Sequence, residues 1–267
     1  MFDNAYFNLG KIDILSYRNT AVHRLDPRAK LLATILFIIT VVSFPKYEIT
    51  GLLPFFLFPV LFFSLGDIPV AFILKKVLLV SVFAVFIGIF NPLLDRRTAA
   101  SLLGVSISGG WISFFSIMIK FFLTITSALL LIATTSFPGI CHALQKMGLP
   151  EIFVSQLLFL YRYIFALSEE AMRVVRARDL RSFGKKGHDI RPFISIVGTL
   201  FLRTVERAER VYQAMLCRGF TGRLHTTRPY NFTAADALFL GSTCVLLYFF
   251  RTHDVVGAAG RISMRMF

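Results

Sequence analysis

The sequence predicts an all-α, polytopic membrane helix bundle that carries two long amphipathic helices in the cytoplasm. Three observations lead to this fold class. The chain of 267 residues is 56% hydrophobic and only 16% charged, whereas soluble domains average about 45–50% apolar and about 25% charged residues. Uncharged stretches recur at lengths suited to a bilayer. The formal net charge is nevertheless +14. This composition argues against both a soluble enzyme and a disordered chain.

The first two stretches that we interpret as membrane crossings are residues 31–44 and 51–66. A helix rises about 1.5 Å per residue, so a hydrocarbon core of about 30 Å needs about 20 residues. The first stretch is short, but Arg28 and Lys30 can extend toward the headgroups at its start. The second contains two prolines, which membrane helices tolerate at the cost of a kink. It is either a kinked crossing or a re-entrant hairpin.

Three further stretches complete a predicted total of five crossings: residues 77–94, 111–135 and 232–250. Lys120 interrupts the middle stretch, and a lysine at membrane depth needs an explanation. Either the span begins deeper, near Phe121, or Lys120 is paired inside the bundle. Both interpretations are structural rather than functional.

Lysine and arginine residues in the loops predict the orientation. Residues 141–230 contain 15 Lys and Arg against 7 Asp and Glu, and the positive-inside rule assigns this segment and the N-terminus to the cytoplasm. The tail fits badly, because a fifth crossing puts Arg251, Arg261 and Arg265 outside. The predicted organisation is an N-terminal membrane domain at 1–135, a cytoplasmic segment at 136–230, and a C-terminal membrane helix and tail at 231–267.

Two long helices are predicted within the basic segment. The first covers residues 151–183 and changes from apolar to charged halfway along, where Glu169 and Arg173 have the spacing of a helical ion pair. The second covers residues 192–218, and Gly219 suits the position just after its last turn. An apolar stripe recurs at helical spacing along the second helix, at Phe201, Val205, Ala208, Tyr212 and Met215. Both helices are therefore expected to be amphipathic.

Three blocks of sequence follow one another in an order typical of a known family. The first holds Ile12-Asp13, Tyr17-Arg18-Asn19 and the run HRLDPRAKL at residues 23–31; the second holds YRYIF at 161–165, Glu170 and Arg176-Ala177-Arg178; the third is AMLCRGF at 214–220. With these blocks the chain resembles the T component of energy-coupling-factor transporters, in the cobalt/nickel-type CbiQ branch.

The resemblance implies a non-catalytic scaffold in the cell inner (plasma) membrane. Such a subunit couples two cytoplasmic ABC-type ATPase subunits to a substrate-binding membrane S component, here for import of cobalt or nickel ions. In this family two cytoplasmic helices end in Ala-Arg-x motifs that dock on the ATPases. The motifs correspond here to Ala177, Arg178 and Asp179, and to Cys217, Arg218 and Gly219. Two positions depart from the family pattern, since Cys217 stands where Ala is usual and Asp179 where a small or neutral residue is usual.

The sequence predicts no catalytic site, no metal site and no cofactor in this chain. It has no phosphate-binding loop of the form G-x-x-x-x-G-K-[ST] and no His and Cys cluster with metal-ligand spacing. We therefore expect the partner subunits to bind ATP and the transported ion. His23 is interpreted as a local capping or pairing residue beside Asp26, which itself suits the N-cap before Pro27.

Alternative interpretations come from other classes of protein. A membrane-embedded enzyme, for example one acting on lipids, would need a cluster of His or carboxylate side chains at the interface. An independent secondary transporter would show internal repeats with broken helices in both halves. Each arginine at a helix end also suits the helix dipole, and the whole basic segment suits anionic lipid headgroups. Nucleic-acid binding is not expected, because the apolar stripes favour a protein partner.

The charge distribution predicts that residues 141–230 face the cytoplasm. Single cysteines placed near Lys185 and Lys186 should resist labelling by a membrane-impermeant reagent in intact cells, because the membrane separates them from the reagent. Ready labelling from outside would contradict the predicted topology.

Overall fold

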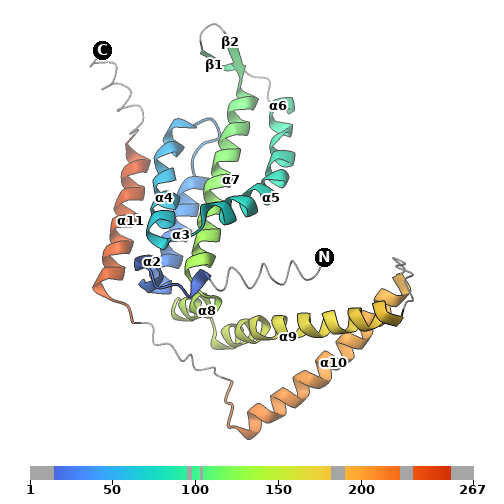
Figure 1. Ribbon diagram of the computed structural model, residues 1–267. Helices are drawn as coiled ribbons and strands as arrows, with labels where there is room; N and C mark the ends of the chain where they lie inside the picture. The colour runs from blue at the N-terminus through green and yellow to red at the C-terminus, as the bar shows by residue number, and fades with distance from the viewer. Residues whose placement is uncertain (1–14, 95–97, 103–104, 182–189, 223–230, 254–267) are drawn as a thin grey trace. The chain divides into compact units, whose positions relative to one another are not determined.

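The computed structural model describes residues 15–94, 98–102, 105–181, 190–222 and 231–253 (Figure 1). Over these residues the chain is helical apart from one short antiparallel hairpin, which confirms the all-α class. Two compact units are present: a bundle unit, residues 12–136 with 230–267, and a helix-pair unit, residues 1–11 with 137–229. Lys185 and Lys186, near which labels are suggested above, lie outside the described residues.

The bundle unit contains most of the helices. Its elements are α2 (Ala21–Arg24), α3 (Pro27–Val42), η1 (Thr50–Phe56), α4 (Leu57–Gly66), α5 (Val70–Gly88), α6 (Phe90–Leu94), β1 (Thr98–Leu102), β2 (Val105–Ser108), α7 (Gly109–Thr134) and α11 (Ala234–Thr252). The predicted start of α3 is confirmed: Asp26 is its N-cap, the Asp26 carboxylate accepts a hydrogen bond from the backbone N–H of Arg28, and Pro27 occupies the first helical position.

The chain is a multi-pass membrane protein. Four helical segments of the described chain are long and apolar enough to cross a membrane: Val70–Pro92, Gly109–Thr134, Glu151–Arg181 and Ala234–Thr252. Three of them overlap the crossings predicted at 77–94, 111–135 and 232–250. The other two predicted crossings correspond to the shorter α3 and η1–α4, and the remaining candidate is α9 (Glu151–Arg181), which the sequence assigns to the cytoplasm.

The segment predicted as a kinked crossing or a re-entrant hairpin is one continuous helical run. Phe56 and Leu57, where η1 passes into α4, both have right-handed helical backbone angles, so the chain does not reverse there. A 3₁₀ helix rises about 2.0 Å per residue and an α-helix about 1.5 Å, so the run measures about 29 Å. This length matches a hydrocarbon core although the segment has few residues.

The predicted start of the third crossing differs from the structure. α5 begins at Val70, so Lys75 and Lys76 lie within the helix rather than in the loop before it. Nζ of Lys76 lies 5.1 Å from the centroid of the Phe72 ring. A lysine in the first turns of a membrane helix can extend its long stem to the headgroups, and for this reason charge alone did not mark the helix start.

Aromatic rings form the centre of the bundle. Phe37 on α3 is fully buried and stacks on Phe58 of α4, with ring centroids 4.4 Å apart. Phe55 of η1 contacts Phe44 at 5.3 Å and Phe250 of α11 at 5.9 Å, again between ring centroids. α3 therefore packs against η1 and α4, and α11 closes over η1.

Basic side chains satisfy the C-terminal end of α3. Lys120 of α7 donates a hydrogen bond to the backbone carbonyl of Phe44 at 2.6 Å. Arg251 of α11 donates to the carbonyl of Ser43 at 3.4 Å and lies 4.3 Å from the centroid of the Phe44 ring. This hydrogen bond confirms the interpretation in which Lys120 is paired inside the bundle.

The helix-pair unit contains α8 (Phe137–Lys146), α9 and α10 (Ile190–Cys217). Both long helices predicted from the sequence are present with nearly the predicted bounds, whereas α8 was not predicted. Gly148 ends α8 with a φ of +105°, and the N–H of Leu149 donates to the carbonyl of Leu144 at 3.1 Å. Phe137 stacks on Tyr161, with ring centroids 4.7 Å apart, so α8 packs on α9.

Truncating the central ring should destabilise the bundle. Phe37→Ala removes a fully buried ring that stacks on Phe58, and such a cavity costs about 3 kcal/mol. We expect a clear fall in the thermal unfolding midpoint of the detergent-solubilised chain. The control is Ile39→Ala on the same helix, since Ile39 is 59% exposed. Equal effects of the two variants would contradict the assignment of Phe37 to the core.

Candidate functional site

The six predicted site residues lie at the C-terminal ends of two helices. Ala177, Arg178 and Asp179 belong to the last turns of α9, where Arg178 is half-buried and its two neighbours are exposed. Cys217 is the last residue of α10, and Arg218 and Gly219 follow it; all three are exposed. Each motif thus presents an arginine at the negative end of a helix dipole.

Backbone geometry fixes the motif after α10. Gly219 has a φ of +77°, which favours glycine. The N–H of Phe220 donates to the carbonyl of Met215 at 3.0 Å, and the N–H of Gly219 donates to the carbonyl of Leu216 at 2.9 Å. These two bonds define a Schellman motif, so the C′ position predicted for Gly219 is confirmed. Arg218 is held at a defined helix end rather than on a free loop.

The chain beyond this motif folds back onto α9. The ring of Phe220 packs edge-on against Phe159, with centroids 6.1 Å apart. The hydroxyl of Ser155 donates to the carbonyl of Gly222 at 3.2 Å. Neither Phe220 nor Ser155 is a predicted site residue; the signal available for Phe220 is an aromatic residue directly after the C′ glycine.

One carboxylate ties α9 to α10 near their middles. Glu170 accepts hydrogen bonds from Arg173 on its own helix at 2.6 Å and from Arg203 on α10 at 2.8 Å. The sequence predicts a helical ion pair of Glu169 with Arg173, and the structure shows an ion pair of Arg173 with Glu170. The three-residue spacing is also a helical pairing distance, and Arg203 was not recognisable as a partner because it lies 33 positions away.

The two arginine motifs lie at opposite ends of this helix pair. α9 and α10 run in opposite directions (Figure 1), and Arg178 lines a cavity together with Ser195 near the start of α10. From Ser195 to Cys217, α10 rises about 33 Å at 1.5 Å per residue. The motifs are therefore too far apart to form one site.

An apolar groove separates the two helices on the side toward Phe220. Its volume is about 720 Å³. Aliphatic and aromatic side chains of both helices line it, among them Ile152, Leu160, Ile164, Val211, Tyr212 and Met215. Most of the predicted stripe on α10 is at least partly exposed, with Phe201 66% and Tyr212 51% exposed. Such a surface is typical of a site that binds a partner.

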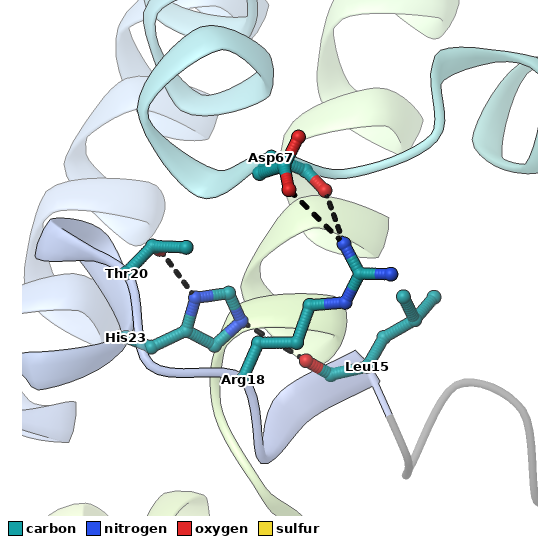
Figure 2. A network of polar contacts seen from close by, with 5 residues as sticks. All are labelled: Leu15, Arg18, Thr20, His23 and Asp67. Atoms are coloured by element: carbon teal, nitrogen blue, oxygen red, sulfur yellow. Dashed lines mark hydrogen bonds and ion pairs between the residues drawn. The ribbon is translucent and has the colours of Figure 1, made fainter.

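The first sequence block has a structural role (Figure 2). Nε2 of His23 donates to the carbonyl of Leu15 at 3.1 Å, and Nδ1 is hydrogen-bonded to the hydroxyl of Thr20 at 2.7 Å. Burial, together with the nearby charge of Lys30, lowers the pKa of His23 below its usual value. The predicted local pairing of His23 is thus confirmed, and its partners are Thr20 and Leu15.

Arg18 in the same block holds the turn between α4 and α5. It donates to the carbonyl of Asp67 at 2.6 Å, and its guanidinium lies 3.5 Å from the Asp67 carboxylate. Asp67 has a φ of +49°, a left-handed conformation that Asp tolerates better than most residues. Within the described ranges, no group of three or more His, Cys, Asp and Glu side chains could hold a metal ion.

The chain is similar in sequence to known membrane transport proteins. The model of the CbiQ family, described as cobalt transport protein, matches residues 18–229. An energy-coupling factor transporter transmembrane protein EcfT of Ruminiclostridium cellulolyticum is 27% identical over 247 residues, which cover 86% of this chain and 91% of the relative. EcfT of Bacillus subtilis is 26% identical over 86% of this chain and 94% of the relative. A putative fused cobalt transport protein CbiMQ of Methanocorpusculum labreanum is 31% identical over 33% of this chain and 15% of the relative.

Replacing the turn glycine should loosen the end of α10. Gly219→Ala forces a Cβ into a left-handed conformation, which costs about 1–2 kcal/mol. Hydrogen exchange of the amides of Arg218 and Phe220 should become about tenfold faster. Gly198→Ala is the matched control: Gly198 lies inside α10 with open space around it, so alanine should be neutral or stabilise the helix by up to about 1 kcal/mol. Unchanged exchange in Gly219→Ala would argue against this turn as the determinant of the motif.

Proposed function

This chain belongs to the CbiQ family of cobalt transport proteins, and from that premise we propose that it is the T component of an energy-coupling-factor importer. It catalyses no reaction itself. Its role is to hold two cytoplasmic ATPase subunits and a membrane S component together, and to pass the movement of the ATPases to the membrane. The EcfT relatives, which align with most of this chain, support the assignment.

One observation carries the proposal: two arginine motifs stand at opposite ends of one helix pair. Arg178 and Arg218 are separated by about 33 Å of α10, and each lies at a helix C-terminus. A single ligand cannot reach both, whereas two copies of one subunit can each take one motif. Two ATPase subunits therefore fit the pair better than any small molecule.

The chemistry of the motifs suits docking. A guanidinium has five donors in a planar fork, so it can bind a carboxylate with two hydrogen bonds or join the carbonyls at a helix end. Ala177 and Gly219 beside the arginines are small and exposed. Cys217, the departure from the family pattern, is also small enough to enter a groove that accepts alanine. We propose that each arginine inserts into a groove of one ATPase subunit.

A cytoplasmic position of α9 follows from its charges. The helix as a whole is long and apolar enough for a crossing, but its second half carries Glu169, Glu170, Arg173, Arg176, Arg178, Asp179 and Arg181. Buried charges at bilayer depth are expensive. We therefore propose that the first half lies in the membrane interface and that the second half reaches the ATPases.

The apolar groove between α9 and α10 is suited to binding the S component, the second kind of partner. It is open and lined mainly by aliphatic and aromatic side chains. An S component is a membrane protein, so its outer surface is apolar and can cover such a groove without leaving polar groups unpaired. We assign the groove to the S component, which would also bind the transported ion.

Cobalt or nickel ions are the proposed substrate. The family description supports cobalt transport. The names of the EcfT relatives specify no substrate, and a T component shared by S components of other specificity is the second candidate. In both cases this chain would perform the same mechanical task.

Removing either motif arginine should weaken the complex. Arg178→Ala or Arg218→Ala should leave membrane insertion intact and lower ATPase affinity by about 2 kcal/mol, which is about thirtyfold. The double variant should be worse, and Arg→Lys should rescue only partly, because an ammonium group lacks the fork. The measurements are co-purification of the ATPases and uptake of radiolabelled cobalt.

The controls for this experiment are Arg181→Ala and Arg210→Ala. Both residues are exposed on the same two helices. Arg173 and Arg203 are unsuitable controls, because both bind Glu170 and hold α9 to α10. If the controls cost as much as the motif variants, total basic charge and lipid binding explain the segment. If neither motif variant changes docking or uptake, the coupling assignment is wrong.

A further inference from the structure

A buried charge cluster lies where the chain leaves the bundle unit. The chain passes between the units after Lys11, after Ser136 and after Pro229. Two of these links border described residues of the bundle. Thr134, the last residue of α7, precedes the link at Ser136, and Thr233, the N-cap of α11, follows the link at Pro229. Lys30 donates to Thr134, Asp236 accepts from Thr233, and the backbone N–H of Asp26 donates to Asp236.

Lys30 fixes the end of α7. The side chain does not extend toward the headgroups as the sequence suggests: it is 1% exposed, and its Nζ donates to the carbonyl of Thr134 at 2.8 Å. The last carbonyls of a helix have no partner within the helix, and a cation is favourable at that end. The residue that holds the exit of α7 is therefore supplied by α3, more than a hundred positions earlier.

Asp236 fixes the start of α11. Its Oδ2 accepts hydrogen bonds from the N–H and the hydroxyl of Thr233, at 2.8 and 2.6 Å, which forms a capping box. Its Oδ1 accepts from the backbone N–H of Asp26 at 2.7 Å. Asp236 is 2% exposed. One carboxylate thus joins the entry of α11 to the entry of α3.

Asp26 completes the cluster. It caps α3 through the N–H of Arg28, and Nε of Arg28 lies 3.8 Å from its Oδ1. Two buried carboxylates are therefore balanced by Lys30 and by the guanidinium of Arg28. Within the described chain, Oδ2 of Asp26 has no hydrogen-bond partner, so the cluster depends on its positive charges for balance. Removing one of them leaves an uncompensated buried charge, which is strongly destabilising.

We propose that Lys30, Asp26 and Asp236 are positioning residues that fix the end of α7 and the start of α11, so that movement of the coupling helices reaches the bundle. The proposal rests on the proposed function, because it assumes that the ATPases move those helices. Force applied at a link moves a helix only if the helix end cannot yield. Hydrogen-bonded charges in a low-dielectric site provide this resistance, since breaking one contact exposes a buried charge.

A purely structural role is the competing explanation, and charge-balanced variants separate the two. Lys30→Met removes the donor to Thr134 and leaves a net negative cluster, so it should lower the unfolding midpoint. Lys30→Met combined with Asp236→Asn restores charge balance, and the double variant should recover much of the lost stability. It still lacks the donor to Thr134 and one acceptor for Thr233. Arg24→Met is the control, because Arg24 is an exposed basic residue at the end of α2.

The experiment uses the complete complex with its ATPases and S component in nanodiscs. Hydrogen exchange of α5 and α11 amides is compared with and without ATP turnover. The wild type and Arg24→Met should show an ATP-dependent difference in exchange. The double variant should retain the ATPases and hydrolyse ATP, but its ATP-dependent difference should shrink about fivefold or more.

The outcomes distinguish this inference from the function beneath it. A wild-type chain that retains no ATPase would overturn the proposed function and the inference with it. A wild-type complex that assembles but shows no ATP-dependent change in the bundle would overturn the inference alone. The same holds if the double variant, with stability regained, also regains the full ATP-dependent change, because the cluster would then serve only folding.

Discussion

The bundle depends on satisfying both ends of α3 without water. Lipid offers no hydrogen bonds, so the terminal backbone groups of a helix at the membrane must find partners within the protein. Side chains of α7 and α11 bind the backbone at these ends: Asp236 of α11 accepts from the N–H of Asp26 before α3, while Lys120 and Arg251 donate to the carbonyls of Phe44 and Ser43 just after it. In turn, Lys30 of α3 donates a hydrogen bond to the carbonyl of Thr134 at the end of α7. Three helices are thereby locked in register by polar contacts, and the phenylalanine core packs between them.

The helix-pair unit is built on the opposite principle. One carboxylate joins α9 to α10 near their middles, and an aromatic contact joins α9 to Phe220, just after the end of α10. Much of the facing surface is left apolar and open, as the groove of about 720 Å³ shows. The bundle binds its own helix ends with its own side chains, whereas the helix pair leaves apolar surface uncovered. The two units are therefore suited to different tasks. The first resists deformation in lipid, and the second leaves surface for other subunits.

Local signals in the sequence predicted the elements that local chemistry determines. Proline and glycine positions gave the bounds of α9 and α10, and the Asp26–Pro27 pair gave the start of α3. Contacts between distant residues could not be identified from spacing. Glu170 binds Arg203 across the helix pair, and the pairing expected for Lys120 has its partner at Phe44, 76 positions away. α8 was not predicted because it is short. α5 begins before the predicted residue 77, because lysines can extend to the headgroups from within a helix.

The exposed thiol of Cys217 has a practical consequence for spectroscopy. Of the three cysteines, Cys141 is buried, and burial raises its thiol pKa to about 11, while Cys244 lies half-buried in α11. A maleimide reacts with the thiolate, so Cys217 is the native attachment point for a fluorophore. The dye would sit directly beside Arg218. The position that departs from the family motif therefore gives the unmodified chain a reporter at one of its two proposed contact points.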